Sequence, residues 1–451
     1  MPKKIILLLA VLLLLISQAA AAELPLTATA AILVEQTTGE VIYSRNPHAR
    51  MYPASTTKML TALVAVEHLS MDTVVFVGPE IRSMPAGFAT NLHMEGETIT
   101  VRVLLKALLI RSSNEAGRIL AIETIRTIDN NRNITYNEAK PRFSQLMNEY
   151  ARALGATNSN FNNPYGLHSE FHYTTAYDMA LIGRAFMDSD EIRAISAMPT
   201  FEGDSLGGQY FASANVRNYS WVNTNLMLPG TTFGHPYIVG GRTGFTTHSG
   251  HCFVGGANRN GFGLVAVVLY SQEPARWADT RMLLDHGFFN YYFRQVAEDG
   301  QFLTAVEIEN PRLGDDNSLD IYLYSGYNTL INRATEVTYE IIFDPILLCA
   351  YSAETILRAP IEEGEMVGSV IFSAGNEIIF SSPAIAARTV YPRTFDSDMD
   401  HYMSMILDNI FTRRGLPYWF GFLGLVIGIV GITLAISAKR KARGLSNWHK
   451  L

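Results

Sequence analysis

The chain has 451 residues, of which 48% are hydrophobic and only 17% are charged, and its formal net charge is −7. Such a chain is too apolar to be disordered, is long enough for two or three domains, and offers no basic surface for nucleic acid. The charged fraction lies below the roughly 25% of an ordinary soluble domain, so we expect part of the chain to lie in lipid.

Residues 1–22 have the pattern of a secretory signal peptide. Lys3 and Lys4 precede an uninterrupted apolar run over residues 5–16, and the small residues Ala20, Ala21 and Ala22 stand directly before Glu23. The apolar run is too short to cross a bilayer core of about 30 Å, which disfavours a membrane anchor. We therefore expect this segment to be removed on export.

A mixed pattern of strands and helices follows over residues 23–300. Apolar runs at 31–34 and 41–43 flank a turn and predict a hairpin, and a helical apolar period extends over residues 55–68. Strands at both ends of the segment with helices between them predict the α+β class, one antiparallel sheet covered by helices. The other expected elements are helices at 101–109, 143–154, 177–187 and 281–293, and a hairpin of 252–257 with 264–270.

The composition changes over residues 301–395. Short runs rich in β-branched and aromatic residues are separated by Gly, Asn, Asp and Pro, and no good helical pattern occurs among them. This pattern predicts a small all-β domain. Its expected strands are 319–323, 337–343, 367–372 and 377–380.

The C-terminal part predicts attachment to a membrane. Residues 396–415 place apolar side chains such as Met399 and Met403 at helical spacing, as in an amphipathic stalk beside a membrane. Residues 416–438 carry no charge and are long enough to span a bilayer as a helix. The basic tail, residues 439–451, indicates a cytosolic end by the positive-inside rule, so residues 23–415 would lie outside.

The first long helix begins with a possible nucleophile and a possible base. Ser55 and Lys58 are three residues apart, so their side chains share one helix face and could meet one turn apart. The Ser-x-x-Lys spacing alone carries no weight, because a chain of this length should contain about one match by chance.

Two more motifs follow it in order. Ser112-x-Asn114 comes directly after an expected helix, and Arg242-Thr243-Gly244 lies on an expected strand. Ser-x-x-Lys, Ser-x-Asn and basic-Thr-Gly in this order resemble the three motifs of the penicillin-recognising serine acyltransferases, which include penicillin-binding proteins and serine β-lactamases.

The resemblance extends beyond the motifs and covers most of the chain from about residue 27 to residue 390. The stretches at 162–167, 179–184 and 359–364 are similar to the low-molecular-mass D-alanyl-D-alanine carboxypeptidases. This likeness implies a β-lactamase/transpeptidase-like domain, then a β-rich domain and a membrane-associating segment. It also implies a serine carboxypeptidase that removes the terminal D-alanine from peptidoglycan stem peptides and is acylated by penicillin.

The resemblance implies a role for each motif residue. Ser55 would form the acyl-enzyme, Lys58 would act as its base, and Ser112 would pass a proton to the leaving D-alanine nitrogen. The backbone N–H groups of Ser55 and Phe245 would form the oxyanion hole, and Asn114 would bind the peptide backbone or Lys58. The implied substrate-binding residues are Asn114, Arg242, Thr243, Gly244, Phe245 and Arg276, of which Arg242, Thr243 and Arg276 would hold the terminal carboxylate.

Lys58 can act as a base near neutrality only if its pKa is depressed by about three units. Burial and a nearby cation both act in that direction, and Arg242 is the candidate cation. Arg242 stands where the family usually has Lys. An arginine keeps its charge and suits a carboxylate, but it cannot take part in the proton transfers open to lysine.

Three rival functions share this sequence pattern. A DD-endopeptidase that cuts cross-links would use the same residues on a substrate carrying a second peptide. A wall-binding scaffold without turnover is suggested by Arg242 alone, and the other motif residues argue against it. A β-lactamase is disfavoured because no E-x-x-L-N segment is recognisable.

The sequence gives no indication of a metal or another cofactor. His248 and His251 lie near the third motif, and His168 and His172 are four residues apart, but no H-E-x-x-H motif or cysteine cluster accompanies them. The two cysteines of the chain are too few for a disulfide scaffold, and we expect no bond between them.

Overall fold

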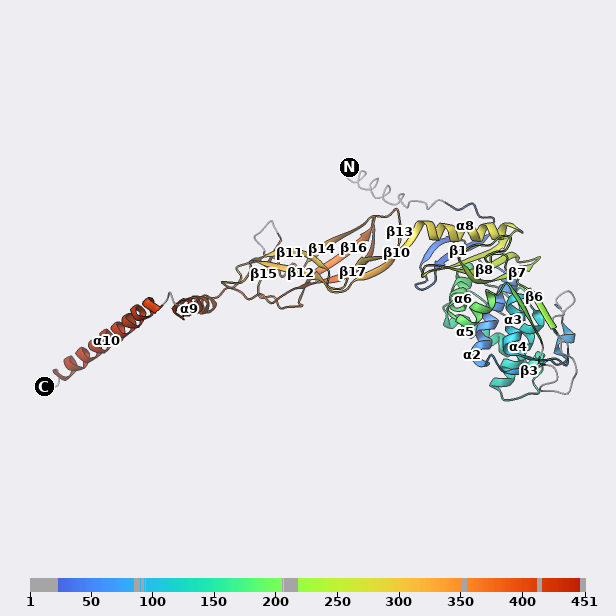
Figure 1. Ribbon diagram of the computed structural model, residues 1–451, viewed down its shortest axis with the longest axis horizontal. Coiled ribbons are helices and arrows are strands. Elements are labelled where there is room, and N and C mark those ends of the chain that lie inside the picture. Colours follow the sequence, from blue (N-terminus) through green and yellow to red (C-terminus); the bar gives the residue numbers. More distant parts are fainter. Residues whose placement is uncertain are drawn as a thin grey trace, which may run out of the picture. The chain divides into compact units, whose positions relative to one another are not determined.

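The computed structural model describes residues 23–84, 90, 93, 95–204, 206, 218–349, 355–411 and 416–446. The expected signal peptide therefore lies outside the described residues. Contacts divide the chain into two compact units, the first ending at Tyr292 and the second beginning at Phe293 (Figure 1). The sequence places this boundary after residue 300.

An antiparallel sheet in the order β2-β1-β9-β8-β7 organises the first unit. The ends of the unit meet in this sheet, because β1 pairs with β9 from Ala30 opposite Leu269 to Glu35 opposite Leu264. Both expected hairpins are confirmed, as β1 pairs with β2 and β8 pairs with β9. The strands are β1 (Ala30–Glu35), β2 (Val41–Arg45), β7 (Ile238–Thr246), β8 (Gly250–Arg259) and β9 (Phe262–Ser271).

Helices cover both faces of this sheet, with α8 on one face and the other helices on the opposite face (Figure 1). The expected helices at 101–109 and 177–187 are confirmed, whereas two others begin earlier than expected. The α5 helix begins where the backbone N–H of Thr135 donates to the Glu138 carboxylate, and α8 begins directly after Pro274. The helices are α2 (Lys58–His68), α3 (Val101–Ile110), α4 (Asn114–Ile128), α5 (Tyr136–Ala153), α6 (Ala176–Asp188), α7 (Asp190–Ser196) and α8 (Ala275–Asn290).

The sequence does not predict α4, although this helix is almost entirely buried. Its buried positions include Glu115, Arg118 and Glu123 as well as Ile119 and Ile122, so buried charged side chains interrupt the apolar period of the helix. The sequence also misses α7 and the short hairpin of β5 (Thr200–Asp204) with β6 (Asn218–Val222). The remaining short elements of this unit are η1 (Ala54–Thr57), β3 (Val74–Phe76), η2 (Pro79–Ser83) and β4 (Thr98–Thr100).

The core of the first unit contains side chains from the sheet and from the helices that pack on it. Most of α3 is fully buried, and Phe143 of α5 and Phe186 of α6 are inaccessible to solvent. Complete burial of such a side chain contributes about 1.5–3 kcal/mol relative to an exposed one. The helix ends and the strand that carry the three motifs are therefore held on a rigid interior.

The second unit is built around a six-stranded sheet in the order β14-β16-β17-β12-β11-β15, and the expected strands are confirmed. Its sheet has an apolar core that includes Leu319, Ile321 and Val370. The strands of this sheet are β11 (Phe302–Glu309), β12 (Ser318–Leu323), β14 (Val337–Phe343), β15 (Ile356–Arg358), β16 (Met366–Ala374) and β17 (Glu377–Ala386); β10 (Tyr291–Ala297) pairs separately with β13 (Tyr327–Asn332).

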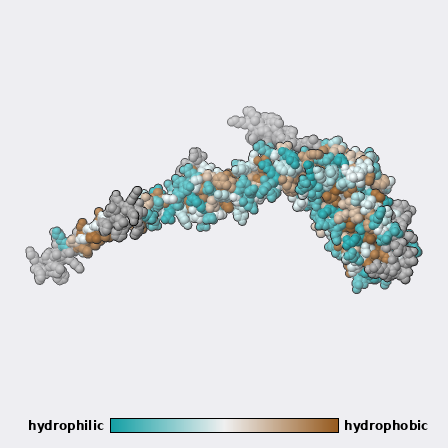
Figure 2. Space-filling view, in the orientation of Figure 1, coloured by the Kyte–Doolittle hydropathy of each residue, from teal (hydrophilic) through white to brown (hydrophobic). Residues whose placement is uncertain are grey.

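Two helices end the described chain. The α9 helix (Phe395–Phe411) exposes apolar side chains such as Met399 and Met403, and α10 (Leu416–Ser446) exposes Leu425 and Ile427. Figure 2 shows hydrophobic surface on the α10 helix. Within the described part of the chain, no helix is both long enough and apolar enough to cross a membrane. The membrane span expected over residues 416–438 is therefore not supported.

Candidate active site

Ser55 lies in a tight turn rather than in the body of a helix. It belongs to η1, a single 3₁₀ turn before α2, and its neighbour Ala54 has a φ of 47°, in the left-handed region that disfavours side chains with a Cβ. Thr56 and Thr57 hold this turn by donating their hydroxyls to Pro53 O and Ala54 O, each at 2.7 Å. The half-buried Ser55 side chain is thereby fixed before any ligand binds.

Gly166 closes the turn from the opposite side. A Cβ at this position would lie 1.8 Å from Ala54 O, and the φ of Gly166 is +86°, so only glycine fits. Asn163 shapes the loop that carries it, because its Oδ1 accepts from the backbone N–H groups of Gly166 at 2.8 Å and Leu167 at 2.9 Å. The loop is thus pressed against the residue that precedes Ser55.

Lys58 is fully buried and its amine has three neighbours. Nζ lies 2.9 Å from Ser55 Oγ, 2.7 Å from Asn114 Oδ1 and 2.8 Å from Tyr165 O. The expected meeting of Ser55 with Lys58 and the expected contact of Asn114 with Lys58 are both confirmed. The first two motifs and the loop of residues 163–167 therefore converge on one nitrogen atom.

The three neighbours fix the orientation of a neutral amine. A neutral Lys58 has two N–H groups and one lone pair, and the amide oxygen of Asn114 and the carbonyl oxygen of Tyr165 can only accept. Both N–H groups are then used by these oxygens, and the lone pair points to Ser55, the one neighbour of the three that can donate. The geometry arranges a base against the serine hydroxyl.

The electrostatic setting favours that neutral form. Burial lowers the pKa of Lys58 well below its usual value, and the positive charge of Arg242 lowers it further. The carboxylate of Glu115 acts in the opposite direction and is the weakest of the three influences. This direction is the one that the sequence leads us to expect for Arg242.

Ser112 lies at the junction of α3 and α4. Its φ is 65°, in the left-handed region, and among the described residues no hydrogen bond joins its hydroxyl to Ser55 or Lys58. The next residue, Ser113, caps α4, since its Oγ accepts from the backbone N–H of Ala116 at 3.1 Å. This cap sets the start of α4, so that Asn114 reaches Lys58.

The third motif lies on β7, which packs directly against the turn of Ser55. A Cβ on Gly244 would lie 2.9 Å from Pro53 O and 3.0 Å from Ser55 N, so glycine permits this close approach. The following residue, Phe245, is 54% exposed and stacks on His251 with a ring separation of 4.3 Å. The backbone of Gly244 and Phe245 thus lies beside the backbone of the nucleophile.

Arg242 is completely buried. Its Nη1 donates to Leu109 O at 2.7 Å and to Thr224 Oγ1 at 3.2 Å, while Nε and Nη2 have no hydrogen-bond partner among the described residues. Burial, then Arg276 and Arg111, lower the pKa of its guanidinium to about 9, so it remains a cation at neutral pH. It reaches no open surface in this structure.

Arg276 belongs to a separate charged group at the start of α8. Its Nε lies 3.0 Å from Glu273 Oε2, and its guanidinium carbon stacks over the Trp277 ring at 4.2 Å. The same carboxylate oxygen lies 3.2 Å from His251 Nδ1. The charge of Arg276 also lowers the pKa of Arg242.

Sequence reasoning assigned no role to several residues that complete the site. The Tyr165 carbonyl and Asn163 lie in a stretch that the family resemblance covers, and this was the only signal for them. His172 is buried, and its Nε2 shares a hydrogen bond of 2.9 Å with Thr57 Oγ1. Burial lowers its pKa to about 3, so it is a neutral structural side chain. No feature of the sequence indicated a role for Thr224.

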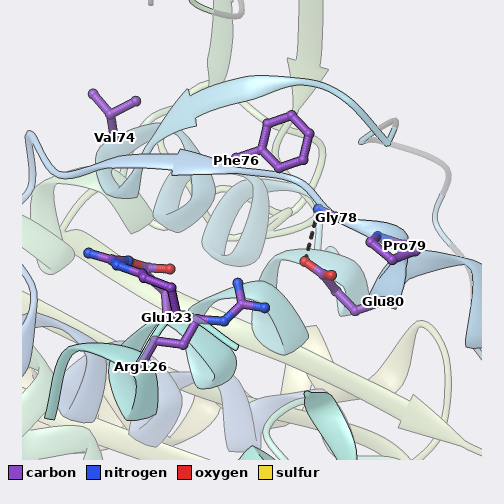
Figure 3. Close-up of a pocket in the computed structure, with 8 residues that line it drawn as sticks. Val74, Phe76, Gly78, Pro79, Glu80, Glu123 and Arg126 are labelled. Carbon is purple, nitrogen blue, oxygen red and sulfur yellow. Dashed lines mark hydrogen bonds and ion pairs between the residues drawn. The ribbon is translucent and has the colours of Figure 1, made fainter. Parts of the chain in front are cut away.

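A cavity of about 560 Å³ lies elsewhere in the first unit (Figure 3). Phe76, Glu80, Glu123 and Arg126 line it, and the motif residues do not. Glu123 is roughly 14 Å along α4 from Asn114, at about 1.5 Å per residue, so this cavity is separate from the site around Ser55. Among the described residues, no group of three or more His, Cys, Asp or Glu side chains could hold a metal ion.

Comparison with known proteins agrees with this geometry. A family described as D-alanyl-D-alanine carboxypeptidase matches residues 17–273, more than half of the chain. The D-alanyl-D-alanine carboxypeptidase DacF of Bacillus subtilis is 27% identical over 375 residues, which cover 81% of this chain and 86% of that protein. A D-alanyl-D-alanine endopeptidase of Pseudomonas aeruginosa is 30% identical over 232 residues, covering 51% of this chain and 66% of the relative.

A solved structure shares the fold. The crystal structure of the D-alanyl-D-alanine carboxypeptidase DacD from Francisella tularensis superposes with a TM-score of 0.62 at 24% identity. The match covers 82% of this chain and 95% of that one. The likeness therefore includes residues of both units.

Proposed function

This chain belongs to the D-alanyl-D-alanine carboxypeptidase family, and from this premise we propose that Ser55 and Lys58 carry out its reaction. The protein is a serine peptidase, a hydrolase that releases D-alanine from peptidoglycan peptides ending in D-alanyl-D-alanine and that binds penicillin. The assignment of each step to a side chain is our proposal.

In the acylation step, the neutral Lys58 amine takes the proton of the Ser55 hydroxyl. Ser55 Oγ forms a bond to the carbonyl carbon of the penultimate D-alanine, and the peptide C–N bond breaks. The leaving D-alanine nitrogen accepts a proton, for which Ser112 is the proposed carrier. In the second step, water attacks the ester, the shortened peptide leaves, and Ser55 recovers its proton.

Two further groups of the site support this chemistry. The backbone N–H groups of Ser55 and Phe245 are proposed as the oxyanion hole, and the close approach of Gly244 to Ser55 N supports this placement. For the terminal carboxylate, we propose Thr243 and Arg276, with Asn114 beside the peptide backbone. Arg242 lowers the pKa of Lys58 and contributes positive charge from within the protein.

The observation that carries the proposal is the set of contacts at Lys58 Nζ, in which two acceptors leave the lone pair for Ser55. The test uses the purified protein and a diacetylated tripeptide ending in D-Ala-D-Ala. We expect release of free D-alanine and, with penicillin, a covalent adduct that mass spectrometry locates on Ser55. An adduct on another residue would refute the assignment, and absence of both reactions would favour a scaffold without turnover.

A cross-link-cutting activity is the second candidate, because one relative is named as a D-alanyl-D-alanine endopeptidase. The same nucleophile and base would serve, since only the group attached to the leaving nitrogen differs. Digestion of a purified muropeptide dimer tests it, with conversion to monomers as the positive result. Dimers that persist while the tripeptide is cleaved would exclude this second activity.

We also propose that the protein acts outside the cytoplasm, attached to the bacterial membrane by its C-terminal region. Residues 1–22 have the signal-peptide pattern, and the exposed apolar side chains of α9 and α10 support attachment. Expression of the chain in a bacterium, followed by fractionation and N-terminal sequencing, tests both parts. Washed membranes should hold the full chain and release a variant ending after residue 394, whereas an intact Met1 would contradict export by cleavage.

A further inference from the structure

The buried position of Arg242 raises a question about how its charge affects a ligand. The guanidinium has no exposed surface, so a carboxylate in an open cleft cannot contact it in this structure. Thr243, the next residue, is 8% exposed, and Thr224 is partly exposed. The hydroxyls of these threonines are therefore closer to solvent than the cation.

Arg242 is held at the C-terminal end of α3. Its Nη1 donates to Leu109 O, one of the last carbonyls of the helix, which have no partner within the helix itself. The helix macrodipole places negative partial charge at this end, which favours a cation there. The same nitrogen also donates to Thr224 Oγ1 at 3.2 Å.

Thr224 is fixed at the same helix end through its backbone. Its N–H donates to Ile110 O at 3.1 Å, the carbonyl next to the one that Arg242 uses. The preceding residue, Asn223, is buried, and its side-chain amide donates to Ser196 O at 3.0 Å and to Met198 O at 2.9 Å. The position of the Thr224 hydroxyl is thus set by its neighbours and not by the ligand.

The hydroxyl of Thr224 bridges two residues of the third motif. It accepts from Arg242, and its oxygen lies 3.1 Å from the hydroxyl oxygen of Thr243. A guanidinium N–H can only donate, so the single proton of Thr224 is available for Thr243. If Thr224 donates to Thr243, the proton of the Thr243 hydroxyl is not used in the bridge and is available for a ligand.

We infer that Thr224 is a positioning residue that transmits the charge of buried Arg242 to the Thr243 hydroxyl, which then donates to the terminal carboxylate of the substrate. Hydrogen bonds arranged in a chain polarise one another, so a donor at the end of a chain that begins with a cation is a stronger donor. This inference rests on the proposed function, because it assumes that Thr243 contacts the substrate carboxylate. It also explains how an arginine without exposed surface can serve carboxylate recognition.

The experiment compares two β-lactams that differ only in the carboxylate. Purified full-length parent, Thr224→Val and Thr224→Ser proteins are each acylated with benzylpenicillin and with its methyl ester, and the rate of adduct formation at Ser55 is followed by mass spectrometry. Loss of one hydrogen bond in the chain should lower the rate of Thr224→Val with the free acid about tenfold. With the ester, the same variant should change little, and Thr224→Ser should restore the parental preference for the acid.

A matched control is Thr232→Val, because Thr232 is exposed in the loop that follows and makes none of these contacts. It should acylate like the parent with both compounds. Equal losses of Thr224→Val with acid and ester would show a merely structural role and would overturn the inference, as would no loss with either. If Thr224→Val does not fold, as judged by its melting temperature, Thr224→Ala removes the same hydroxyl and must meet the same criterion.

The proposed function fails in a different way. If the parent itself forms no adduct at Ser55 with benzylpenicillin and releases no D-alanine, the catalytic assignment is wrong. If the parent reacts normally and the Thr224→Val protein keeps the parental preference for the acid over the ester, only the inference about Thr224 is wrong.

Discussion

The interiors of the two units differ in the polar groups that they enclose. The first unit buries Lys58, Arg242, Glu115 and His172, whereas among the described residues of the second unit Ser382 is the buried polar side chain. Both units nevertheless have a continuous apolar core. The second unit shows that a sheet of this chain can be buried by apolar packing without enclosed charge.

The buried charged side chains of the first unit serve its chemistry rather than its stability. Burial of an unpaired charge costs several kcal/mol, and a well-packed apolar group of the same size is often as stable or more stable. Lys58 lies beside the nucleophile, and the buried cation Arg242 lowers its pKa and so favours the neutral amine. We therefore expect changes in the first unit to affect chemistry more than stability, and changes in the core of the second unit to do the reverse.

The largest effect is expected for Ser55→Ala. Removal of the nucleophilic oxygen should lower D-alanine release by about 10⁴-fold or more and abolish the penicillin adduct, since no other group can form the ester. The melting temperature should stay near that of the parent because Ser55 is only half-buried. Penicillin labelling at the parental level would contradict the role of this residue.

Lys58→Met should come next. The change keeps an unbranched side chain one atom shorter and removes the base, and loss of a general base typically lowers the rate by about 10²–10⁴-fold. The rate of penicillin acylation measures the effect, and Lys140→Met, at an exposed lysine, is the matched control. An acylation rate within a few-fold of the parent would show that another group removes the proton from Ser55.

A smaller, pH-dependent effect is expected for Arg242→Gln. Activity requires neutral Lys58, so kcat/KM should fall as the pH drops through the pKa of this lysine. The charge of Arg242 lowers that pKa, so its removal raises the pKa and moves the acid limb of the profile to higher pH. Profiles of the parent, Arg242→Gln and the exposed control Arg152→Gln test this, and an unchanged or lowered acid limb would refute the coupling.

The smallest effect on activity is expected for Ile321→Ala in the second unit. Ile321 is fully buried in β12, and its truncation should destabilise this unit by about 2–5 kcal/mol. Cleavage of the soluble tripeptide should be unchanged, because the residues around Lys58 all lie in the first unit. Denaturant unfolding and kcat/KM measure the two quantities, and Ile378→Ala, at a 64% exposed position, is the control. A reduced kcat/KM for Ile321→Ala would show that the units are coupled in function.

Much of the fold could be predicted because its signals are local. The hairpins around residues 31–43 and 252–270 follow from apolar runs and turn residues, and the β-rich pattern after residue 301 matches a real sheet. The α4 helix could not be predicted in this way, since its buried positions include Glu115 and Arg118. Their burial depends on partners supplied by other parts of the chain.

The membrane prediction shows a similar limit. The uncharged run over residues 416–438 predicts a span by its length alone. The helix α10 occupies this region, but no described helix meets the length and apolarity of a span. The expected span rested only on the length and the uncharged composition of residues 416–438.

The sequence by itself indicated that Ser55 and Lys58 could meet, because residues three apart on a helical turn share a face. It also indicated the order of the motifs and the family. Only the tertiary structure decided that Tyr165 O and Asn114 Oδ1 direct the lysine lone pair, that Arg242 is buried, and that Thr224 bridges it to Thr243. These contacts join segments far apart in the chain, and their distances depend on how helices and strands pack rather than on residue spacing.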